Sequence, residues 1–162
     1  MKDIRILHGN YLGSDKMEVL NRKAKFDYFV EEEFEAGIVL SGTEIKAIRN
    51  GSCNIRDCYG IVKNGEIFLL NMYIGEYKEG NIFNHNTTRS RKLLLHKKEI
   101  QKISKLVELN GLTLIPLKGY FKENKFKILL GVCRGKKNVD KRETIKERDI
   151  RRETLKKIKN YK

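Results

Sequence analysis

Residues 59–70 read YGIVKNGEIFLL, and this stretch predicts the fold most directly. Two short runs rich in aliphatic and aromatic residues flank the dipeptide Asn64-Gly65. Asn followed by Gly is the pair that best tolerates positive φ at both central positions of a two-residue turn. We therefore expect an antiparallel hairpin, with one strand over Tyr59–Lys63 and the other over Glu66–Leu70.

Upstream of this hairpin the sequence predicts further strand. Apolar residues alternate with other residues from Phe26 to Glu31, and the pattern extends through Phe34. Residues 37–40 continue it, either as a second short strand or as the same strand after a bend. Residues 1–20 have no clear period, so we expect a loosely ordered N-terminal arm there.

Two helices are predicted on either side of the hairpin. The first begins at Ser41–Glu44, which has the S-x-x-E spacing of a capping box, and ends at Asn50-Gly51. The second begins at about His96 and ends at Asn110-Gly111, with apolar residues at helical spacing between these points. The first helix has only about two turns.

Two more strands are expected over 112–121 and 125–130, joined by a turn at Glu123-Asn124. Pro116 lacks a backbone N–H, so it should lie at an edge or a bulge. Several short strands with two helices indicate a mainly β fold, a small closed or nearly closed barrel over residues 21–135. Such barrels are common scaffolds for binding oligonucleotides.

Residues 136–162 differ in composition from the rest of the chain and are predicted to be a basic C-terminal tail. They hold 12 Lys or Arg and 5 Asp or Glu, a net charge of +7. The few apolar residues are too widely spread around a helical wheel to form a stripe that faces a core. We expect a segment that is disordered alone and becomes helical on an anionic partner.

The charge of the whole chain points to such a partner. Its 162 residues carry 35 Lys and Arg against 21 Asp and Glu, a formal net charge of +14. Nucleic acid, an acidic membrane and an acidic protein are the usual partners of so basic a chain. No apolar run approaches a membrane span, and the start resembles neither a signal nor a transit peptide, so no membrane partner is expected.

Enzyme and metal chemistry are not indicated. The three histidines lie in unrelated contexts, and the sequence has no nucleophile elbow, P-loop or dinucleotide-binding glycine motif. Cys53, Cys58 and Cys133 form no CxxC pair, and their odd number excludes a full disulfide framework. We expect reduced thiols, a cytoplasmic protein, no metal, no cofactor and no catalytic residues.

Basic groups stand beside strands in three places, at residues 21–25, 89–92 and 135–137. Each group alone is better explained by solubility. Together with the tail they indicate a surface that binds phosphates. Nearby aromatic residues, and the lack of a helix-turn-helix or zinc finger, favour unpaired or looped RNA over duplex DNA.

Six sequence blocks resemble the SsrA-binding protein (small protein B, SmpB) family, in family order over about residues 21–148. The resemblance implies an oligonucleotide-binding-type barrel that binds the tRNA-like domain of transfer-messenger RNA and delivers it to stalled ribosomes. The blocks are NRKA at 21–24, DYFVEE at 27–32, EAGIVL at 35–40, GTEIK at 42–46, RKLLL at 91–95, and GKK at 135–137 followed by DKR at 140–142.

The resemblance places Asn21, Glu35, Leu94 and Lys127 at RNA-contact positions. Asn21 could equally cap local structure, Glu35 could pair with Arg or Lys, and Leu94 could belong to the core. Lys127 alternates away from its apolar neighbours and should face solvent or phosphate. Combined with the basic groups, the predicted RNA-binding residues are Asn21, Arg22, Lys23, Glu35, Arg89, Arg91, Lys92, Leu94 and Lys127.

The tail is implied to enter the decoding centre and the empty mRNA channel of the ribosome. Family members commonly carry His or an aromatic residue where this chain has Val139, and an aromatic further along is replaced by Ile150 or its neighbour. Asn86-Thr87-Thr88 stands where the family has Asp-Pro-Thr. The predicted ribosome-binding residues are Lys136, Lys137, Val139, Asp140, Lys141 and Arg142.

Two other functions are compatible with the composition. One is a general ribosome-associated or single-stranded RNA-binding module without a role in ribosome rescue. The other is an enzyme with an unrecognised site. In the rescue role, the chain would act as a monomer and leave peptide transfer to the ribosome.

Overall fold

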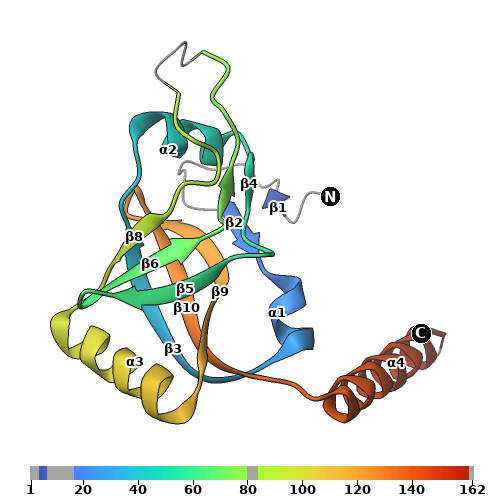
Figure 1. Ribbon diagram of the computed structural model, residues 1–162. Coiled ribbons are helices and arrows are strands. Elements are labelled where there is room, and N and C mark those ends of the chain that lie inside the picture. The colour runs from blue at the N-terminus through green and yellow to red at the C-terminus, as the bar shows by residue number, and fades with distance from the viewer. Residues whose placement is uncertain (1–3, 7–16, 80–83, 161–162) are drawn as a thin grey trace.

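The computed structural model describes residues 4–6, 17–79 and 84–160. In this part of the chain, eight strands form one sheet in the order β1-β2-β9-β10-β3-β8-β6-β5, and β5 also pairs with β9. The strands from β9 to β5 thus close into a ring (Figure 1). The strands of this sheet are β1 Ile4–Ile6, β2 Met17–Leu20, β3 Tyr28–Ile38, β5 Tyr59–Lys63, β6 Glu66–Leu70, β8 Arg91–Leu94, β9 Thr113–Lys122 and β10 Lys125–Gly135.

The ring confirms the predicted closed or nearly closed sheet. It closes where Gly60 of β5 pairs with Leu114 of β9. A Cβ at Gly60 would lie 2.8 Å from the Cβ of Leu114, so a glycine is needed for the two strands to approach. A separate two-stranded sheet pairs β4 (Cys53–Asn54) with β7 (Tyr73–Ile74).

The predicted turns are confirmed. Asn64 and Gly65 have φ values of 52° and 72°, as the turn between β5 and β6 requires. Glu123 and Asn124 also have positive φ, at 51° and 62°, between β9 and β10. Leu130 pairs with Pro116 where the β9–β10 register shifts, so Pro116 lies at a bulge.

Four helices lie among the described residues: α1 Arg22–Asp27, α2 Gly42–Arg49, α3 Lys97–Asn110 and α4 Asn138–Asn160. The capping box of α2 is confirmed, because Glu44 N donates to Ser41 Oγ and Ser41 N donates to Glu44 Oε1. Gly111, with φ of 62°, ends α3. Figure 1 shows α2 and α3 at opposite ends of the ring.

Two predictions for the N-terminal part of the chain are corrected. Phe26 lies in α1 rather than in a strand, because the Asn21 side chain accepts a hydrogen bond from Ala24 N and starts a helix there. The strand β3 then runs unbroken to Ile38. Met17–Leu20 is no loosely ordered arm: this segment is β2 and pairs with β9, with Val19 fully buried. Much of the remaining arm lies outside the described residues.

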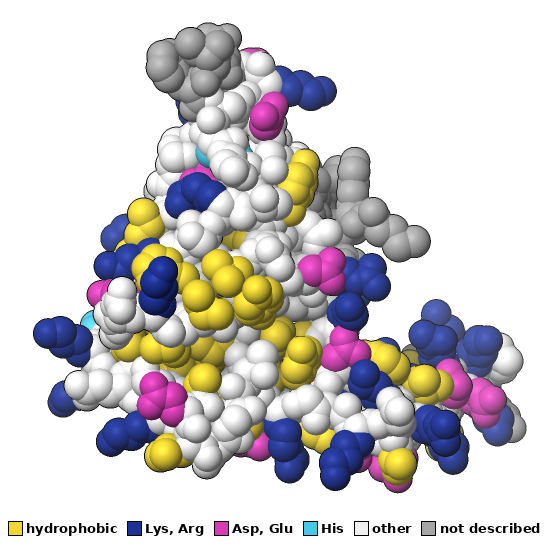
Figure 2. Space-filling view, in the orientation of Figure 1, with side chains coloured by type: hydrophobic (Ala, Val, Ile, Leu, Met, Phe, Trp, Pro, Cys, Tyr) yellow, Lys and Arg dark blue, Asp and Glu magenta, His cyan; other side chains and the backbone are white. Residues whose placement is uncertain are grey.

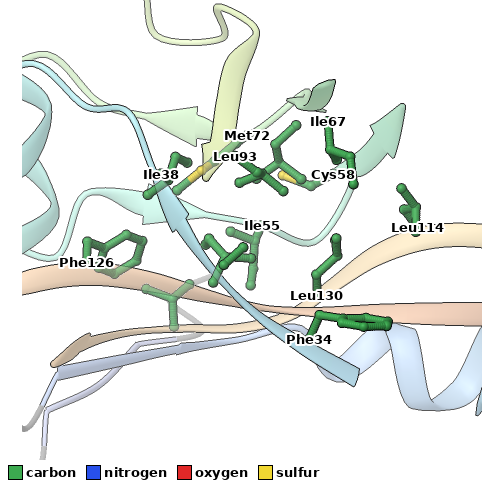
Figure 3. Close-up of a cluster of buried hydrophobic side chains, with 14 of the residues drawn as sticks. Phe34, Ile38, Ile55, Cys58, Ile67, Met72, Leu93, Leu114, Phe126 and Leu130 are labelled. Atoms are coloured by element: carbon green, nitrogen blue, oxygen red, sulfur yellow. The ribbon is translucent and has the colours of Figure 1, made fainter. Parts of the chain in front are cut away.

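The core fills the inside of the ring (Figure 3). In the first half of β10 the side chains alternate between the two faces, so that Phe126 and Ile128 are buried while Lys127 between them is not. The thiols of Cys53, Cys58 and Cys133 are free and buried. Burial raises the pKa of Cys53 to about 12 and that of Cys133 to about 11, so both stay protonated.

The tail forms the helix α4, the conformation expected of it on an anionic partner, and none of the residues 138–160 is buried. It extends away from the ring beside α1 (Figure 1). Lys136 N donates a 2.8 Å hydrogen bond to Asp27 O, and Lys141 Nζ lies 3.5 Å from Asp27 Oδ1. That the tail is disordered without a partner stays a prediction.

Candidate nucleic-acid interface

Three residues predicted to contact RNA meet on the outside of three neighbouring strands. Lys127 of β10 pairs with Gly37 of β3, and Gly37 pairs with Leu94 of β8. Glu35 lies two residues before Gly37, and therefore on the same face of β3. The strand register thus brings Glu35, Leu94 and Lys127 together from distant parts of the sequence.

These residues line a cavity of about 480 Å³, which we name the Glu35 pocket. Gly37 forms part of it, and a Cβ there would lie 3.2 Å from the Cβ of Leu94. Leu94 is 52% exposed, which is high for a leucine at the end of a strand. The pocket is lined by Glu35, Gly37, Leu94, Leu95, His96, Glu99 and Lys127.

Glu35 is held as an ionised acceptor. The Tyr120 hydroxyl donates to Glu35 Oε2, and Lys122 Nζ lies 3.3 Å from Glu35 Oε1. The hydrogen bond from Tyr120, with the charges of Lys122 and Lys127, lowers the pKa of Glu35. Burial and the bond to Glu35 raise the pKa of Tyr120 to about 12, so its hydroxyl remains a donor at neutral pH.

The pocket combines three kinds of contact that suit an unpaired nucleotide. The Glu35 carboxylate can accept from base N–H groups, and Lys127 supplies a cation for phosphate. The Leu94 side chain offers an apolar surface to a base. Tyr120 and Lys122 were not predicted, because only the pairing of β9 with β10 brings them beside Glu35.

Residues 21–23, the first three of the basic group at 21–25, lie in different environments. Asn21 is 4% exposed, and its Nδ2 donates to the carbonyl oxygens of Pro116 at 2.9 Å and Ile55 at 3.2 Å. These bonds and the cap of α1 occupy its side chain, while a direct contact of Asn21 with RNA stays a prediction. Lys23 is exposed near Asp57, at 3.7 Å, and Arg22 lines a separate cavity beside α4.

The basic group at residues 89–92 takes part largely in structural contacts, and an RNA contact by Arg91 stays a prediction. Arg91 has no exposed surface and forms a buried ion pair with Glu44. Arg89 also pairs with Glu44, although a third of its side chain is exposed. Lys92 is more open and lies 3.5 Å from Glu66 across the neighbouring strand.

Glu44 is thus the centre of a buried charge cluster. Burial by itself would raise the pKa of Glu44, but hydrogen bonds from Arg89, the Ser41 backbone and Arg91 lower it to about 2. The carboxylate is therefore ionised at neutral pH inside the protein. Removing either partner of such a buried pair would leave an uncompensated charge inside the protein.

The predicted ribosome-binding residues lie at the start of α4. Asp140 Oδ2 accepts a 3.2 Å hydrogen bond from Lys137 N, and Lys136 Nζ donates to Thr144 Oγ1 at 2.9 Å. Lys141 faces Asp27, whereas Val139 is 65% exposed and Arg142 is also exposed. The segment therefore presents both cationic and apolar groups to solvent.

Within residues 4–6, 17–79 and 84–160, no three His, Cys, Asp or Glu side chains are grouped as a metal site would require. None of the described helices combines the length and the apolar character that a membrane span needs.

Comparison with known proteins places these features in a family. The family model for the SmpB protein matches residues 18–160. The SsrA-binding protein of Clostridium perfringens is 55% identical over 139 residues, 86% of this chain and 89% of the relative. That of Staphylococcus aureus is 54% identical over 139 residues, 86% of this chain and 90% of the relative. A chain from the solved structure "tmRNA-SmpB: a journey to the center of the bacterial ribosome" has a TM-score of 0.63 and 45% identity, covering 75% of this chain and 85% of that chain.

Proposed function

The chain belongs to the SmpB protein family, and we propose that it binds transfer-messenger RNA and delivers it to stalled ribosomes. In this role the RNA-bound protein allows the ribosome to leave a broken message and to tag the nascent peptide. The printed names of the relatives and of the solved structure support an RNA partner and a ribosomal one. The formal net charge of +14 favours binding to the phosphates of both partners.

The Glu35 pocket supports the part of this proposal that concerns RNA binding. An ionised carboxylate, an exposed leucine and a lysine lie on one outer face of β3, β8 and β10. We propose that this face binds unpaired bases of the tRNA-like domain. Glu35 reads base N–H groups, Leu94 packs on a base, and Lys127 binds a phosphate.

We assign the ribosomal half to residues 136–162. This segment has a net charge of +7, forms α4 and buries none of its described residues. It is therefore free to enter the decoding centre and the empty mRNA channel, where its cations face ribosomal RNA. In this proposal the ring in residues 21–135 binds the delivered RNA and the tail binds the ribosome.

The proposed role is that of a positioning protein. Peptide transfer takes place on the ribosome, and the chain acts as a cytoplasmic monomer that holds one RNA in place. It needs neither metal nor cofactor for this task. The family is one of RNA-binding proteins, in keeping with this division of labour.

The variant Glu35→Ala tests the RNA half. We expect it to weaken binding to the tRNA-like domain about tenfold or more, with little change for an unrelated RNA of the same length. Glu32→Ala is the matched control, because Glu32 lies on the same strand, pairs with Lys102 and does not line the pocket. Equal affinity of the unmodified protein for both RNAs would contradict the proposal.

Deletion after Gly135 tests the ribosomal half. Binding to the tRNA-like domain should survive, while tagging of stalled peptides should stop. A general RNA-binding module predicts a different outcome, in which RNA affinity and function decline together. The RNA that co-purifies with the full chain separates the two functions independently.

A further inference from the structure

One row of paired residues crosses the outer face of four strands at the Glu35 pocket. Tyr120 of β9 pairs with Lys127 of β10. Lys127 pairs in turn with Gly37 of β3, and Gly37 pairs with Leu94 of β8. Because Gly37 has no side chain, the row is open between Lys127 and Leu94, and Glu35 borders this opening.

The Glu35 carboxylate is held from the side of β9. The Tyr120 hydroxyl donates to Glu35 Oε2, and Lys122 Nζ lies 3.3 Å from Glu35 Oε1. Neither Tyr120 nor Lys122 is among the described residues that line the pocket. An ionised carboxylate has about four acceptor sites on its two oxygens, and these two contacts occupy one site on each oxygen. One acceptor on each oxygen is therefore left for a ligand.

Two acceptors side by side match two hydrogen-bond donors side by side. Among the four RNA bases, only guanine carries two neighbouring donors on its Watson–Crick edge, the ring N1–H and the exocyclic amino group. Adenine and cytosine place an acceptor beside their amino group, and uracil places its single N–H between two carbonyl oxygens. An acceptor that faces a carboxylate leaves a hydrogen bond unmade, so such bases bind less well.

We propose that the Glu35 pocket is a guanine site, in which Glu35 binds the N1–H and the amino group of one unpaired guanine. This inference rests on the proposed function, in which the ligand is RNA, and it adds the base that the pocket selects. The base enters the opening over Gly37 with one face on Leu94, and Lys127 binds a neighbouring phosphate. Tyr120 is a positioning residue, because it touches the carboxylate and not the base.

A second carboxyl group in the pocket reinforces the choice of guanine. Glu99 lies in the first turn of α3 and lines the pocket, and its Oε1 accepts the backbone N–H of His96. The oxygens of Glu35 and Glu99 repel the lone pairs of base carbonyl oxygens and unprotonated ring nitrogens. Specificity of this kind depends on rejecting the wrong bases as well as on binding the right one.

The alternative ligand is an arginine of a partner protein, because a guanidinium group also carries paired N–H donors. The charges around Glu35 disfavour it, since the positive charges of Lys122 and Lys127 both reach the Glu35 carboxylate. Figure 2 shows many more Lys and Arg than Asp and Glu side chains on the face in view. A neutral base on an anionic backbone fits these charges better than a cationic side chain does.

The test titrates the full-length chain with the tRNA-like domain in which single unpaired guanines are replaced. Inosine lacks only the exocyclic amino group of guanine, so it removes one of the two proposed hydrogen bonds. At one position we expect inosine to lower the affinity about tenfold, which we name the inosine penalty, and adenine to lower it further.

The variant Glu35→Gln should abolish the inosine penalty at that position. Its amide keeps the shape of the carboxylate but offers one acceptor and one donor. Glutamine can pair with adenine through one donor and one acceptor. Adenine at the same position should therefore bind the variant at least as well as guanine does.

The variant Tyr120→Phe tests the positioning of Glu35. It should reduce the inosine penalty, because the carboxylate loses the hydrogen bond that fixes its orientation. A purely structural effect would weaken binding to both RNAs equally and leave the inosine penalty unchanged. Tyr77→Phe is the matched control, since the Tyr77 hydroxyl donates to Glu79 and does not line the pocket.

An inosine penalty that persists in Glu35→Gln, or the lack of any penalty in the unmodified chain, would overturn the guanine site. Binding of a short arginine-containing peptide without an inosine penalty would assign the pocket to a protein partner instead. The proposed function fails separately, when the unmodified chain does not prefer the tRNA-like domain over an unrelated RNA. In that case short oligouridines with one central guanine or inosine provide the test, and equal binding of the two would overturn the site.

Discussion

Arg91 and Glu44 form an ion pair that is wholly enclosed, with Arg91 Nε donating a 2.5 Å hydrogen bond to Glu44 Oε2. Glu44 belongs to α2 and Arg91 to β8. The pair therefore ties this helix to the ring and to the segment that precedes β8. The Arg91 guanidinium also donates to the carbonyl oxygens of Met72, Asn86, Thr87 and Arg89.

Replacing Glu44 by Ala should destabilise the protein strongly. The change leaves the buried Arg91 charge without its partner and removes the capping-box carboxylate of α2. Breaking a buried pair in this way costs about 3–5 kcal/mol. Urea unfolding should show the loss, and Glu66→Ala, which breaks only the exposed pair with Lys92, should change the free energy of unfolding by less than about 1 kcal/mol.

The stability of the protein should fall with acid through the titration of Glu44. Its pKa is about 2 in the folded state, against an ordinary value of 4.5. A lowered pKa stabilises the folded state above the ordinary value, and this contribution is lost as the pH falls from about 4.5 to about 2. It amounts to about 3 kcal/mol, at about 1.4 kcal/mol for each pH unit.

Glu44→Gln isolates this contribution. The variant is less stable at neutral pH, but it has no carboxylate to titrate, so its free energy of unfolding should fall less between pH 4.5 and pH 2. Unfolding by urea at several pH values gives both curves. Parallel curves for the two proteins would show that other carboxylates cause the acid sensitivity.

The contrast between Glu44 and Arg91 shows what the sequence could predict. The capping box was predictable because Ser41 and Glu44 act within one turn of helix. The hairpin at Asn64-Gly65 was predictable for the same reason, since its turn depends on two adjacent residues. Arg91 was predicted as a surface cation, because only the tertiary fold places it against a glutamate 47 residues earlier.

The candidate site also combines local features, which the sequence predicts, with contacts that depend on the tertiary fold. The alternation of β10 correctly predicted that Lys127 faces outward between two buried residues. Glu35 and Leu94 came from the family resemblance, and only the strand register brings them beside Lys127. The short helix α1 was missed because the alternation beginning at Phe26 indicated a strand.

Leu93 and Leu94 should respond in opposite ways to substitution by Ala. Leu93 has no exposed surface, so Leu93→Ala should lower the free energy of unfolding by about 2–5 kcal/mol. Leu94 is half exposed in the Glu35 pocket, so Leu94→Ala should change stability by about 0.5 kcal/mol and weaken binding to the tRNA-like domain. Urea unfolding and RNA titration of both variants test this, and unchanged RNA affinity for Leu94→Ala would remove that side chain from the interface.

Asn21 should act on stability rather than on RNA. Asn21→Ala removes the cap of α1 and leaves the Pro116 and Ile55 carbonyls without their donor, a loss of about 2–4 kcal/mol. Asn54→Ala is the control, since its side chain caps only an exposed turn at Arg56. Well below its melting temperature, the Asn21 variant should bind RNA with the affinity of the unmodified protein, and a selective loss would instead support Asn21 as an RNA contact.

Removal of residues 136–162 should leave the ring nearly as stable as in the full chain. None of the described residues of α4 is buried, and the deletion removes the Lys136 hydrogen bond to Asp27 and the partly exposed Lys141 pair. Losses of this kind amount to about 1–2 kcal/mol together. Urea unfolding followed by tyrosine fluorescence, with Tyr161→Phe in the full chain, reports on the tyrosines outside the tail, while far-ultraviolet circular dichroism reports the loss of α4. A destabilisation above about 4 kcal/mol would mean that the tail completes the folded core, and it would then be unable to leave α1 for the ribosome.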